Sequence, residues 1–378
     1  MTGRTEELGD VAVWTSGGTP PRGLSEYWSG TIPWISAATL RESHIYTSTQ
    51  FLTASGVEKG SNIAPTGSTL ILVRGMALHH ELRVGIATRD VAFNQDVKAL
   101  IPRPFVEPEF LTYAILGKAP EILSLVSSAG SGTGVLNSDR LKRIQIWLPS
   151  RDEQIRVVSR INDLDVLVGS LATTIAKRRA IKQGMMQELL TGRTRLRGFE
   201  SEWGLTALGS VCRIKTGARN NQDKVPNGAY PFFVRSATVE RIDSYSYDTE
   251  AILVPGEGGI GTIFHYINGK FEVHQRVYKI SDFASNVSGK FVYYFMRVFF
   301  GSHAMENSVK ATVDSLRLPT FNSFELSLPP TRAEQEAIVE VLEDADAEIE
   351  ALEKRLEATR QIKEGMMQEL LTGRTRLV

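Results

Sequence analysis

The sequence predicts a mixed α/β fold with a pseudo-twofold internal repeat: two globular domains joined by two long helices that form an antiparallel coiled coil. Three observations predict it. The phrase GMMQELLTGRTRL occurs twice, from Gly184 and from Gly365, and the offset of 365 − 184 = 181 residues is close to half of the 378-residue chain. The residues before each copy carry apolar side chains at helical spacing. The remaining stretches show strand-like alternation between glycine-rich turns. Such self-similarity indicates a tandem duplication.

The segments that end in the repeated phrase are predicted to be long helices, from Glu153 to Leu190 and from Glu334 to Leu371. Their apolar residues are three and four positions apart, which is the seam of a coiled coil rather than the broader stripe of a surface helix. A helix of this length needs a partner, and its own repeat is the natural one. The seam residues are Ile161, Leu164, Val168, Leu171 and Ile175 in the first helix and Leu342, Ala345, Ile349, Leu352 and Leu356 in the second.

The two predicted helices have complementary charge. The first contains the basic stretch AKRRAIK (residues 176–182), and the second contains the acidic stretch EDADAEIEALE (residues 343–353). Opposite charges on paired helices help to fix their pairing and register. This local balance also contributes to a formal net charge of zero. A zero net charge argues against a general nucleic-acid coat protein but does not exclude local basic patches.

The helices divide the chain into a first globular domain at 1–147, a central helical region at 148–198, a second globular domain at 199–327 and a C-terminal helical region at 328–378. Each helix starts after a proline, in LPSRDEQ and LPPTRAEQ, with acidic residues in its first turn. Each ends before a glycine, in LLTGRTRL. The chain also begins with TGRT, at Thr2, so its two ends are expected to meet.

The two globular domains correspond loosely. LILVRG at Leu70 matches AILVPGEG at Ala251, and FNQDVKAL at Phe93 matches VHQRVYKI at Val273. In this comparison the second domain lacks the arginine that the first has at Arg74. The scaffold is shared while the loops differ, which is the pattern expected of two domains that bind different ligands.

Composition indicates an ordinary soluble globular protein, with 42% hydrophobic and 23% charged residues. The single cysteine, Cys212, excludes an internal disulfide and a cysteine-based zinc site, and it fits a reducing cytoplasm. No signal peptide is visible. The most apolar window, FVYYFMRVFF (residues 291–300), is too short to span a membrane and contains Arg297, so it is expected to be a buried helix.

The sequence offers little for catalysis. It has no Asn/Asp-Pro-Pro-aromatic stretch of the kind with which a DNA amino-methyltransferase holds its flipped base, and no GxxxxGK[ST] phosphate loop. His79 and His80 are adjacent and would point apart on a strand, so a shared metal is not expected. No catalytic residue and no metal ligand are predicted.

The order of these features resembles the specificity subunit of a type I restriction-modification system. The resemblance covers the whole chain. It rests on the two LP…EQ helix starts, the helix ends KQGMMQELLTG and KEGMMQELLTG, and strands that end in NQ, such as Gly85 to Gln95. It implies that each globular domain is a target recognition domain that reads one half of a split DNA sequence, and that the coiled coil holds the two domains apart.

The same resemblance implies partners. Two adenine methyltransferase subunits would dock on the helices, and a restriction/translocase subunit would join through them. Those subunits would bind S-adenosylmethionine, ATP and Mg, so this chain is expected to hold no cofactor and to be a non-catalytic reader of double-stranded DNA. The alternative is a two-headed coiled-coil adaptor that binds only proteins. Salt-sensitive binding of duplex DNA by the assembled complex would distinguish the two.

Polar loops with cations beside aromatic or amide side chains are the candidate DNA contacts. Arginine can read guanine, and asparagine or glutamine can read adenine, through paired hydrogen bonds in the major groove. A solvated loop is the alternative for each residue. Gln95 and Gln275, placed alike in both domains, are expected to be structural or to position phosphates. The candidates are Arg22, Tyr27, Trp28, Arg74, His79, Arg83 and Gln95 in the first domain and Arg219, Asn220, Asn221, Lys224, Arg235, His274, Gln275 and Arg276 in the second.

The repeated helix ends are the candidate docking sites for the methyltransferase subunits. They carry apolar residues at adjacent positions, more than one coiled-coil seam can bury. Some are therefore expected to face another protein or the neighbouring globular domain. The candidates are Met185, Met186, Leu189 and Leu190 in the first helix and Met366, Met367, Leu370 and Leu371 in the second.

Overall fold

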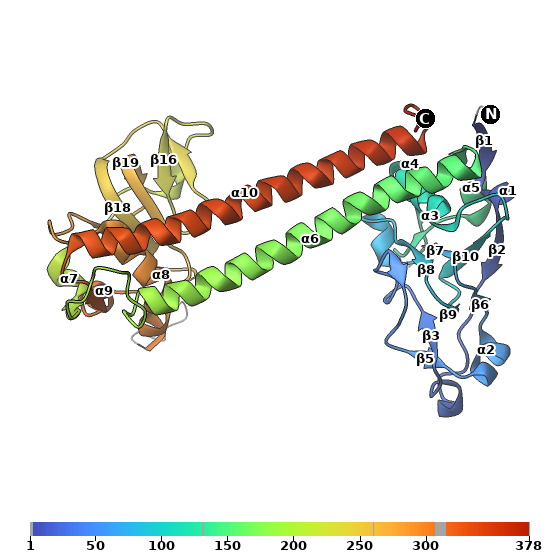
Figure 1. Ribbon diagram of the computed structural model, residues 1–378, viewed down its shortest axis with the longest axis horizontal. Coiled ribbons are helices and arrows are strands. Elements are labelled where there is room, and N and C mark those ends of the chain that lie inside the picture. The colour runs from blue at the N-terminus through green and yellow to red at the C-terminus, as the bar shows by residue number, and fades with distance from the viewer. Residues whose placement is uncertain (1–2, 131, 260, 307–314, 378) are drawn as a thin grey trace. The chain divides into compact units, whose positions relative to one another are not determined.

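The computed structural model describes residues 3–130, 132–259, 261–306 and 315–377, so Thr2 of the first TGRT lies outside the described residues. Two long helices, α6 (Arg151–Leu189) and α10 (Arg332–Leu371), pack against each other (Figure 1). The chain forms two compact units, and each contains part of both helices. Unit 1 comprises Met1–Leu171 and Arg355–Val378, and unit 2 comprises Ala172–Lys354. The predicted α/β fold with paired long helices is confirmed, whereas the four-part division of the chain stays a prediction.

Unit 1 contains a five-stranded sheet, a four-stranded sheet and two strand pairs. The five-stranded sheet has the order β2 (Ala12–Ser16), β10 (Val97–Pro102), β7 (Thr69–Leu72), β8 (Val84–Ala87) and β4 (His44–Ile45). The four-stranded sheet has the order β5 (Phe51–Leu52), β3 (Ile32–Ile35), β9 (Val91–Phe93) and β6 (Ile63–Ala64). The strand pairs are β1 (Arg4–Glu7) with β13 (Gln145–Leu148) and β11 (Ser127–Ser128) with β12 (Gly134–Val135).

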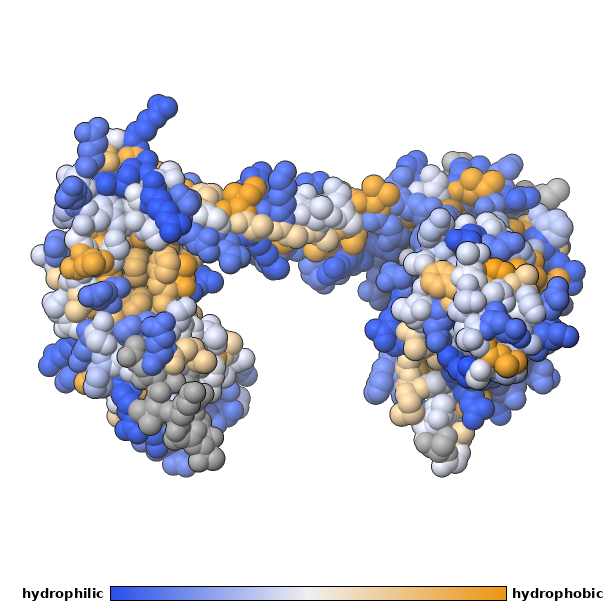
Figure 2. Space-filling model, turned by 90° about the horizontal axis from the view of Figure 1, so that it is seen from below, coloured by the Kyte–Doolittle hydropathy of each residue, from blue (hydrophilic) through white to orange (hydrophobic). Residues whose placement is uncertain are grey.

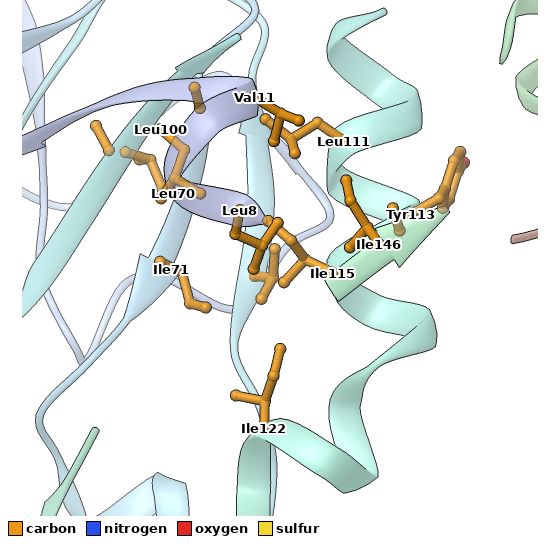
Figure 3. Close-up of a cluster of buried hydrophobic side chains, with 14 of the residues drawn as sticks. Leu8, Val11, Leu70, Ile71, Leu100, Leu111, Tyr113, Ile115, Ile122 and Ile146 are labelled. Atoms are coloured by element: carbon orange, nitrogen blue, oxygen red, sulfur yellow. The ribbon is translucent and has the colours of Figure 1, made fainter. Parts of the chain in front are cut away.

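The main core of unit 1 lies between the five-stranded sheet and the helix α3 (Pro108–Gly117). Leu111 and Ile115 of α3 are buried with Leu70 and Leu100 of the sheet (Figure 3). Proline at the start of α3 lacks the N–H that would be unpaired there, which favours a helix start. The other helical segments are α1 (Leu8–Val11), α2 (Ala54–Gly60), α4 (Ala119–Ser124), α5 (Ser138–Lys142), η1 (Ser25–Tyr27) and η2 (Met76–His79).

Unit 2 is built on one six-stranded sheet and a strand pair. The sheet has the order β15 (Arg213–Thr216), β20 (Val277–Ser281), β18 (Tyr247–Pro255), β19 (His265–Val273), β16 (Tyr230–Phe233) and β17 (Glu240–Ile242). The strand pair joins β14 (Gly204–Ala207) to β21 (Glu325–Leu328). The helical segments are α7 (Leu208–Val211), α8 (Gly289–Glu306), α9 (Leu318–Asn322) and η3 (Asn221–Asp223).

The apolar window at residues 291–300 lies in α8, as predicted for a buried helix. Phe291, Met296 and Phe300 are fully buried, while Arg297 lies over the ring of Tyr293. Among the described residues, no helix is long and apolar enough to cross a membrane. Hydrophilic residues cover much of the surface seen in Figure 2, with hydrophobic residues in small patches.

The predicted coiled-coil seam is confirmed, since all ten of its residues are buried or half-buried. The predicted charge complementarity is also present within unit 2. Arg178 of α6 pairs with Glu348 of α10 at 3.0 Å, and Arg179 pairs with Glu353 at 2.6 Å. These pairs are largely exposed, so they contribute more to register than to stability.

Each long helix begins with a buried glutamate that binds an arginine from beyond the end of the other helix. In unit 1, Glu153 is 2% exposed and accepts hydrogen bonds from Arg376 Nε at 3.1 Å and Nη2 at 2.6 Å. In unit 2, Glu334 accepts from Arg195 Nε at 2.7 Å and Nη2 at 3.0 Å. The hydrogen bonds from Arg376 hold the pKa of Glu153 below its usual value. Helix start and helix end are thereby fixed together in both units.

The glutamine that follows each glutamate fastens the helix start to the globular part. Gln154 and Gln335 are fully buried. The side-chain carbonyl of Gln154 accepts the Glu107 N–H at 2.7 Å, and that of Gln335 accepts the Ser288 N–H at 2.8 Å. Each side-chain amide also donates to two backbone carbonyls. In both helix starts, every polar side-chain atom of the EQ dipeptide therefore takes part in a hydrogen bond that holds the structure together.

A carboxylate of α6 joins three elements of unit 1. Asp165 accepts hydrogen bonds from the Tyr113 hydroxyl of α3 at 3.2 Å and from Lys363 Nζ of α10 at 2.5 Å. The same hydroxyl lies 2.6 Å from Asn162 Oδ1. Burial and the neighbouring Asp165 carboxylate raise the pKa of Tyr113, so the hydroxyl stays protonated and donates.

Unit 2 repeats this contact at an offset of 181 residues. Asp346 of α10 accepts hydrogen bonds from the Tyr294 hydroxyl of α8 at 2.9 Å and from Lys182 Nζ of α6. Burial, and then the hydrogen bond to Asp346, raise the pKa of Tyr294. We call each set of three side chains a Tyr–Asp–Lys triad. The triads fix the α6–α10 register and the position of α3 or α8 on the helix pair.

The two ends of the chain meet in unit 1, as the TGRT repeat predicts. Strand β1 pairs with β13, and the Trp147 ring of β13 lies against both Gly3 and Gly373. A Cβ at Gly373 would come within 2.6 Å of this ring, and its φ of 71° also favours glycine. In unit 2, Gly192 lies against Trp203 in the same way.

Removing the triad hydroxyl should destabilise each unit. We expect Tyr113→Phe and Tyr294→Phe each to lower the free energy of unfolding by about 1 kcal/mol, because the hydroxyl no longer donates, to Asn162 and Asp165 in the first case and to Asp346 in the second, while each aspartate keeps its lysine. Urea unfolding of the purified variants measures the change. Tyr46→Phe, at a largely exposed side chain, is the matched control and should change stability by less than about 0.5 kcal/mol. Equal destabilisation by all three substitutions would contradict a stabilising role for the triads.

Candidate nucleic-acid interface

The turn before β10 in unit 1 and before β20 in unit 2 has the same internal support. Asn94 Oδ1 accepts the Asp96 N–H at 3.1 Å, and His274 Nδ1 accepts the Arg276 N–H at 3.0 Å. Both supporting side chains are buried, with His274 only 4% exposed. Burial, and then the nearby arginines, lower the pKa of His274, which keeps Nδ1 free to accept. His274, a predicted DNA contact, is therefore placed in the interior as the counterpart of Asn94.

The glutamines at the tips of these turns contact the loop that follows the first sheet strand of their unit. Gln95 Oε1 accepts the Thr19 hydroxyl at 2.8 Å, and Gln275 Nε2 donates to Asn220 Oδ1. Both glutamines are exposed apart from these contacts. Their equivalent positions fit the expectation of a structural role, because each holds a loop in place in the same way.

Beside each turn, one backbone position bears a side chain of opposite charge in the two units. The Val73 N–H donates to the Asp96 carbonyl, and the Gly256 N–H donates to the Arg276 carbonyl, both at 2.8 Å. The next residues, Arg74 and Glu257, therefore occupy the same structural position. Each also forms an isolated bridge to the segment before a later short helix, Arg74 with Val135 before α5 and Glu257 with Ser315 before α9. The sequence comparison missed this equivalence, since it placed Pro255 opposite Arg74.

Glu257 connects two predicted DNA contacts of unit 2. Its carboxylate accepts hydrogen bonds from Arg276 Nη1 at 2.8 Å and from Arg235 Nη1 at 3.2 Å. Arg74 of unit 1 is exposed, and among the described residues its side chain has no hydrogen bond or ion pair. His79 lies beside the turn between β11 and β12, where its Nε2 is 2.9 Å from the Gly132 carbonyl oxygen.

A second group of predicted residues meets near the start of unit 1. The Arg22 guanidinium lies 4.5 Å from the Trp28 ring centroid and 5.0 Å from that of Trp34. Its Nη1 also donates to Gln50 Oε1 at 3.2 Å. Tyr27 and Trp28 are half-buried, so Arg22 is the most exposed of this group. Stacked arginine and aromatic side chains can contact bases or sugars as one rigid surface.

The remaining predicted contacts are partly used by the protein itself. Arg83 donates to Glu81 and to the Ala37 carbonyl. Arg219 donates to the buried Glu272 at 3.4 Å.

Three further candidates lie in or next to η3. Lys224 pairs with Glu240 at 3.2 Å, while Asn221 is exposed in η3. Asn220 caps the same short helix in a reciprocal contact with Asp223.

The apolar residues predicted for docking are largely buried in their own units. Leu189 and Leu190 belong to the core of unit 2, and Leu370 and Leu371 to the core of unit 1. Met186 is 8% exposed. The methionines Met185, Met366 and Met367 are half-buried and pack against the same cores. The docking assignment stays a prediction, and the exposed side of the helix ends consists of other residues.

Among the described residues, no group of three or more His, Cys, Asp or Glu side chains could hold a metal ion. Burial raises the pKa of the Cys212 thiol to about 12, so this cysteine is not a reactive thiolate.

The residues that carry the framework are not among the candidates predicted from the sequence. The 181-residue offset marks the members of the triads without showing their contacts, because tyrosine, aspartate and lysine recur at that spacing in Tyr113/Tyr294, Asp165/Asp346 and Lys182/Lys363.

Comparisons with known proteins give one consistent family. A family model described as the type I restriction modification DNA specificity domain matches residues 4–177 and again residues 200–360. The specificity subunit of the type I restriction enzyme EcoR124I/EcoR124II from Escherichia coli is 27% identical over 178 residues, covering 47% of this chain and 44% of that protein. The MjaVIII specificity subunit from Methanocaldococcus jannaschii is 22% identical over 405 aligned residues, covering 98% of this chain and 92% of that protein.

The matches to Escherichia coli EcoR124I/EcoR124II and EcoDI span less than half of those proteins, at 44% and 37% of their length. Two solved structures have the same fold. The S subunit from M. genitalium has a TM-score of 0.63 at 13% identity, covering 98% of this chain and 96% of that one. The HsdS subunit from Thermoanaerobacter tengcongensis has a TM-score of 0.55 at 16% identity, covering 99% and 97%. Because the family model matches most of the sequence, the chain belongs to the type I restriction-modification DNA specificity family.

Proposed function

We propose that this protein is the DNA-reading specificity subunit of a type I restriction-modification complex, and that each unit reads one half of an interrupted target. The observation that carries the proposal is the contrast between framework contacts that recur in both units and surfaces that differ. Both units contain the Tyr–Asp–Lys triad and the Glu–Arg pair, yet the exposed Arg74 and the half-buried Glu257, at the same structural position, have opposite charge. Two equal scaffolds with unlike polar edges are suited to two different base sequences.

The partners proposed for this chain are two adenine methyltransferase subunits and, through them, a restriction/translocase subunit. In this arrangement S-adenosylmethionine, ATP and Mg are bound by the partner subunits. The proposal draws on the family and on the repeated helix ends, which offer the same surface twice. Two copies of one partner need two equivalent docking surfaces.

Within these helix ends, two glycines have no structural explanation in their own units. Gly184 of α6 and Gly365 of α10 are exposed in helix interiors, and a Cβ built at either would meet nothing within 4 Å. Glycine in a helix interior costs about 0.5–1 kcal/mol relative to alanine. A glycine kept at both equivalent sites, in open space, fits a surface on which another protein approaches the helix backbone closely.

Exchange of one recognition domain should change only one half of the target. We expect that replacing residues 6–147 with the corresponding segment of another family member changes one half of the methylated motif. The donor segment must keep a tyrosine opposite Asp165, because the triad holds α3 on the helix pair. Adenine methylation mapped across the genome of cells that carry the complete system gives the motif. A change in both halves together would contradict the hypothesis that each unit recognises one half of the target.

The same cells test whether DNA is bound at all. The purified complex should bind duplex DNA with an affinity that falls steeply with salt, since phosphate contacts release counterions. A protein-only adaptor would give no methylated motif and no salt-dependent binding.

Side chains added at the two glycines should block the methyltransferase subunits. We expect Gly184→Gln with Gly365→Gln to abolish their co-purification, because each glutamine projects from the face proposed for docking. The substitutions also favour the helix, so the subunit should remain folded. Gly169→Gln is the matched control, since a Cβ there also meets nothing within 4 Å but the equivalent position is Glu350. Normal recovery of both methyltransferase subunits with the double variant would argue against this docking face.

A further inference from the structure

A carboxylate lies among the candidate DNA contacts of unit 2. Glu257 binds Arg276 Nη1 through Oε1 and Arg235 Nη1 through Oε2, so each guanidinium has its own oxygen. The Glu257 side chain is 24% exposed, whereas Arg235 and Arg276 are 50% and 59% exposed. The two guanidinium groups thus face solvent more than the carboxylate that holds them.

A carboxylate between two arginines is better suited to base recognition than to phosphate binding. A surface that only grips phosphates is weakened by a carboxylate, which repels the DNA backbone and offsets the nearby cations. An arginine that reads guanine must instead present two N–H groups in a fixed plane to O6 and N7. One N–H given to a carboxylate leaves four others and restricts the side-chain rotamers before DNA arrives.

The backbone fixes the carboxylate as well as the arginines. Glu257 follows the last residues of β18, and the Gly256 N–H donates to the Arg276 carbonyl at 2.8 Å. Gly258 and Gly259 have φ values of 73° and 80°, a backbone conformation that turns the chain away directly after the glutamate. Arg276 is in turn held by the buried His274 through its own N–H. The pair is therefore built on strand ends and not on a free loop.

We propose that Glu257 is a positioning residue that holds Arg235 and Arg276 as a pair of guanine-reading side chains for the half-site recognised by unit 2. This inference rests on the proposed function and specifies the base chemistry of one half of it. Unit 1 has the opposite arrangement, because Arg74 stands in the place of Glu257 and Asp96 in the place of Arg276. Asp96 accepts from Asn94 at 3.0 Å, so unit 1 has no comparable arginine pair there. The effect of Glu257 is therefore confined to one half-site.

Glu257→Gln tests the proposal in the complete complex. The substitution keeps the side-chain shape but leaves one acceptor oxygen for two guanidinium groups. The wild-type motif should contain a G·C pair in the half assigned to unit 2 by domain exchange. In the variant, discrimination at one or two such pairs should fall on the order of tenfold, since a bidentate arginine–guanine contact supplies that much. Methylation should then spread to sites that differ only at those pairs, while the other half-site stays unchanged.

Asp248→Asn is the matched control. It removes the same charge from an exposed residue of β18, seven residues before Pro255, which is roughly 23 Å along an extended strand. It should raise nonspecific DNA affinity about as much as Glu257→Gln does, with no change in the motif. A relaxed motif in both variants would show that net charge, and not the positioning of the arginines, sets the stringency.

The proposal is overturned if Glu257→Gln retains methylation with an unchanged motif, or if the half-site of unit 2 contains no G·C pair. Arg276→Gln in the same assay guards against a folding defect in the first variant. A relaxed half-site in Arg276→Gln supports the proposal, and an unchanged one overturns it. Failure of the proposed function gives a different result, because the wild-type complex itself would then show no bipartite methylated motif.

Discussion

The structure depends on one kind of contact, in which a carboxylate of one long helix accepts hydrogen bonds from a lysine of the other helix and from a tyrosine of the globular part. Asp165 makes it in unit 1 and Asp346 in unit 2. A half-buried carboxylate is stable there only while its partners are present, because an unpaired charge away from water is costly. Sliding one helix along the other would separate aspartate from lysine, and tilting α3 or α8 would separate aspartate from tyrosine. The triads therefore link the register of the coiled coil to the position of each globular part.

The ends of the helices obey the same constraint. Glu153 and Glu334 are buried at the helix starts, and each needs the arginine that follows the opposite helix end. This requirement explains much of the repeated phrase GMMQELLTGRTRL, because Leu190, Thr194 and Arg195 all contact their own unit. It does not explain the exposed glycine at the start of the phrase. Packing and hydrogen bonding within each unit account for the apolar and hydrogen-bonding residues of the repeat. The repeated residues that they do not explain lie on the exposed side of both helices.

The sequence was sufficient for features that depend on periodicity, and insufficient for those that depend on contacts between distant segments. The seam, the charge complementarity of the helices and the buried α8 follow from spacing and composition, and all are present. The contacts of Asp165 with Tyr113 and Lys363 join residues 52 and 198 positions apart, which no local pattern reveals. His274 was placed among surface contacts because a histidine beside a polar tip has no burial signal in one sequence. The match between Arg74 and Glu257 was missed because it is set by the hydrogen-bond register of the strands. The alignment of the two sequences placed Pro255, two residues earlier, opposite Arg74.

The two units separate the residues that hold the fold from those that differ between the surfaces. Asn94 and His274 are chemically different, yet each is buried and accepts a hydrogen bond from the backbone N–H two residues later. The turn therefore has the same support in both units although its sequence differs. Directly beside it, Arg74 and Glu257 have opposite charge on the same backbone position, and neither takes part in a triad or in a glutamate–arginine pair of the helix ends. Substitutions at such positions alter the charge and hydrogen-bonding groups offered to a ligand without removing a partner from a buried charge. Because the partners of the buried charges and the residues that differ between the units are different side chains, one framework can present two unlike surfaces within a single chain.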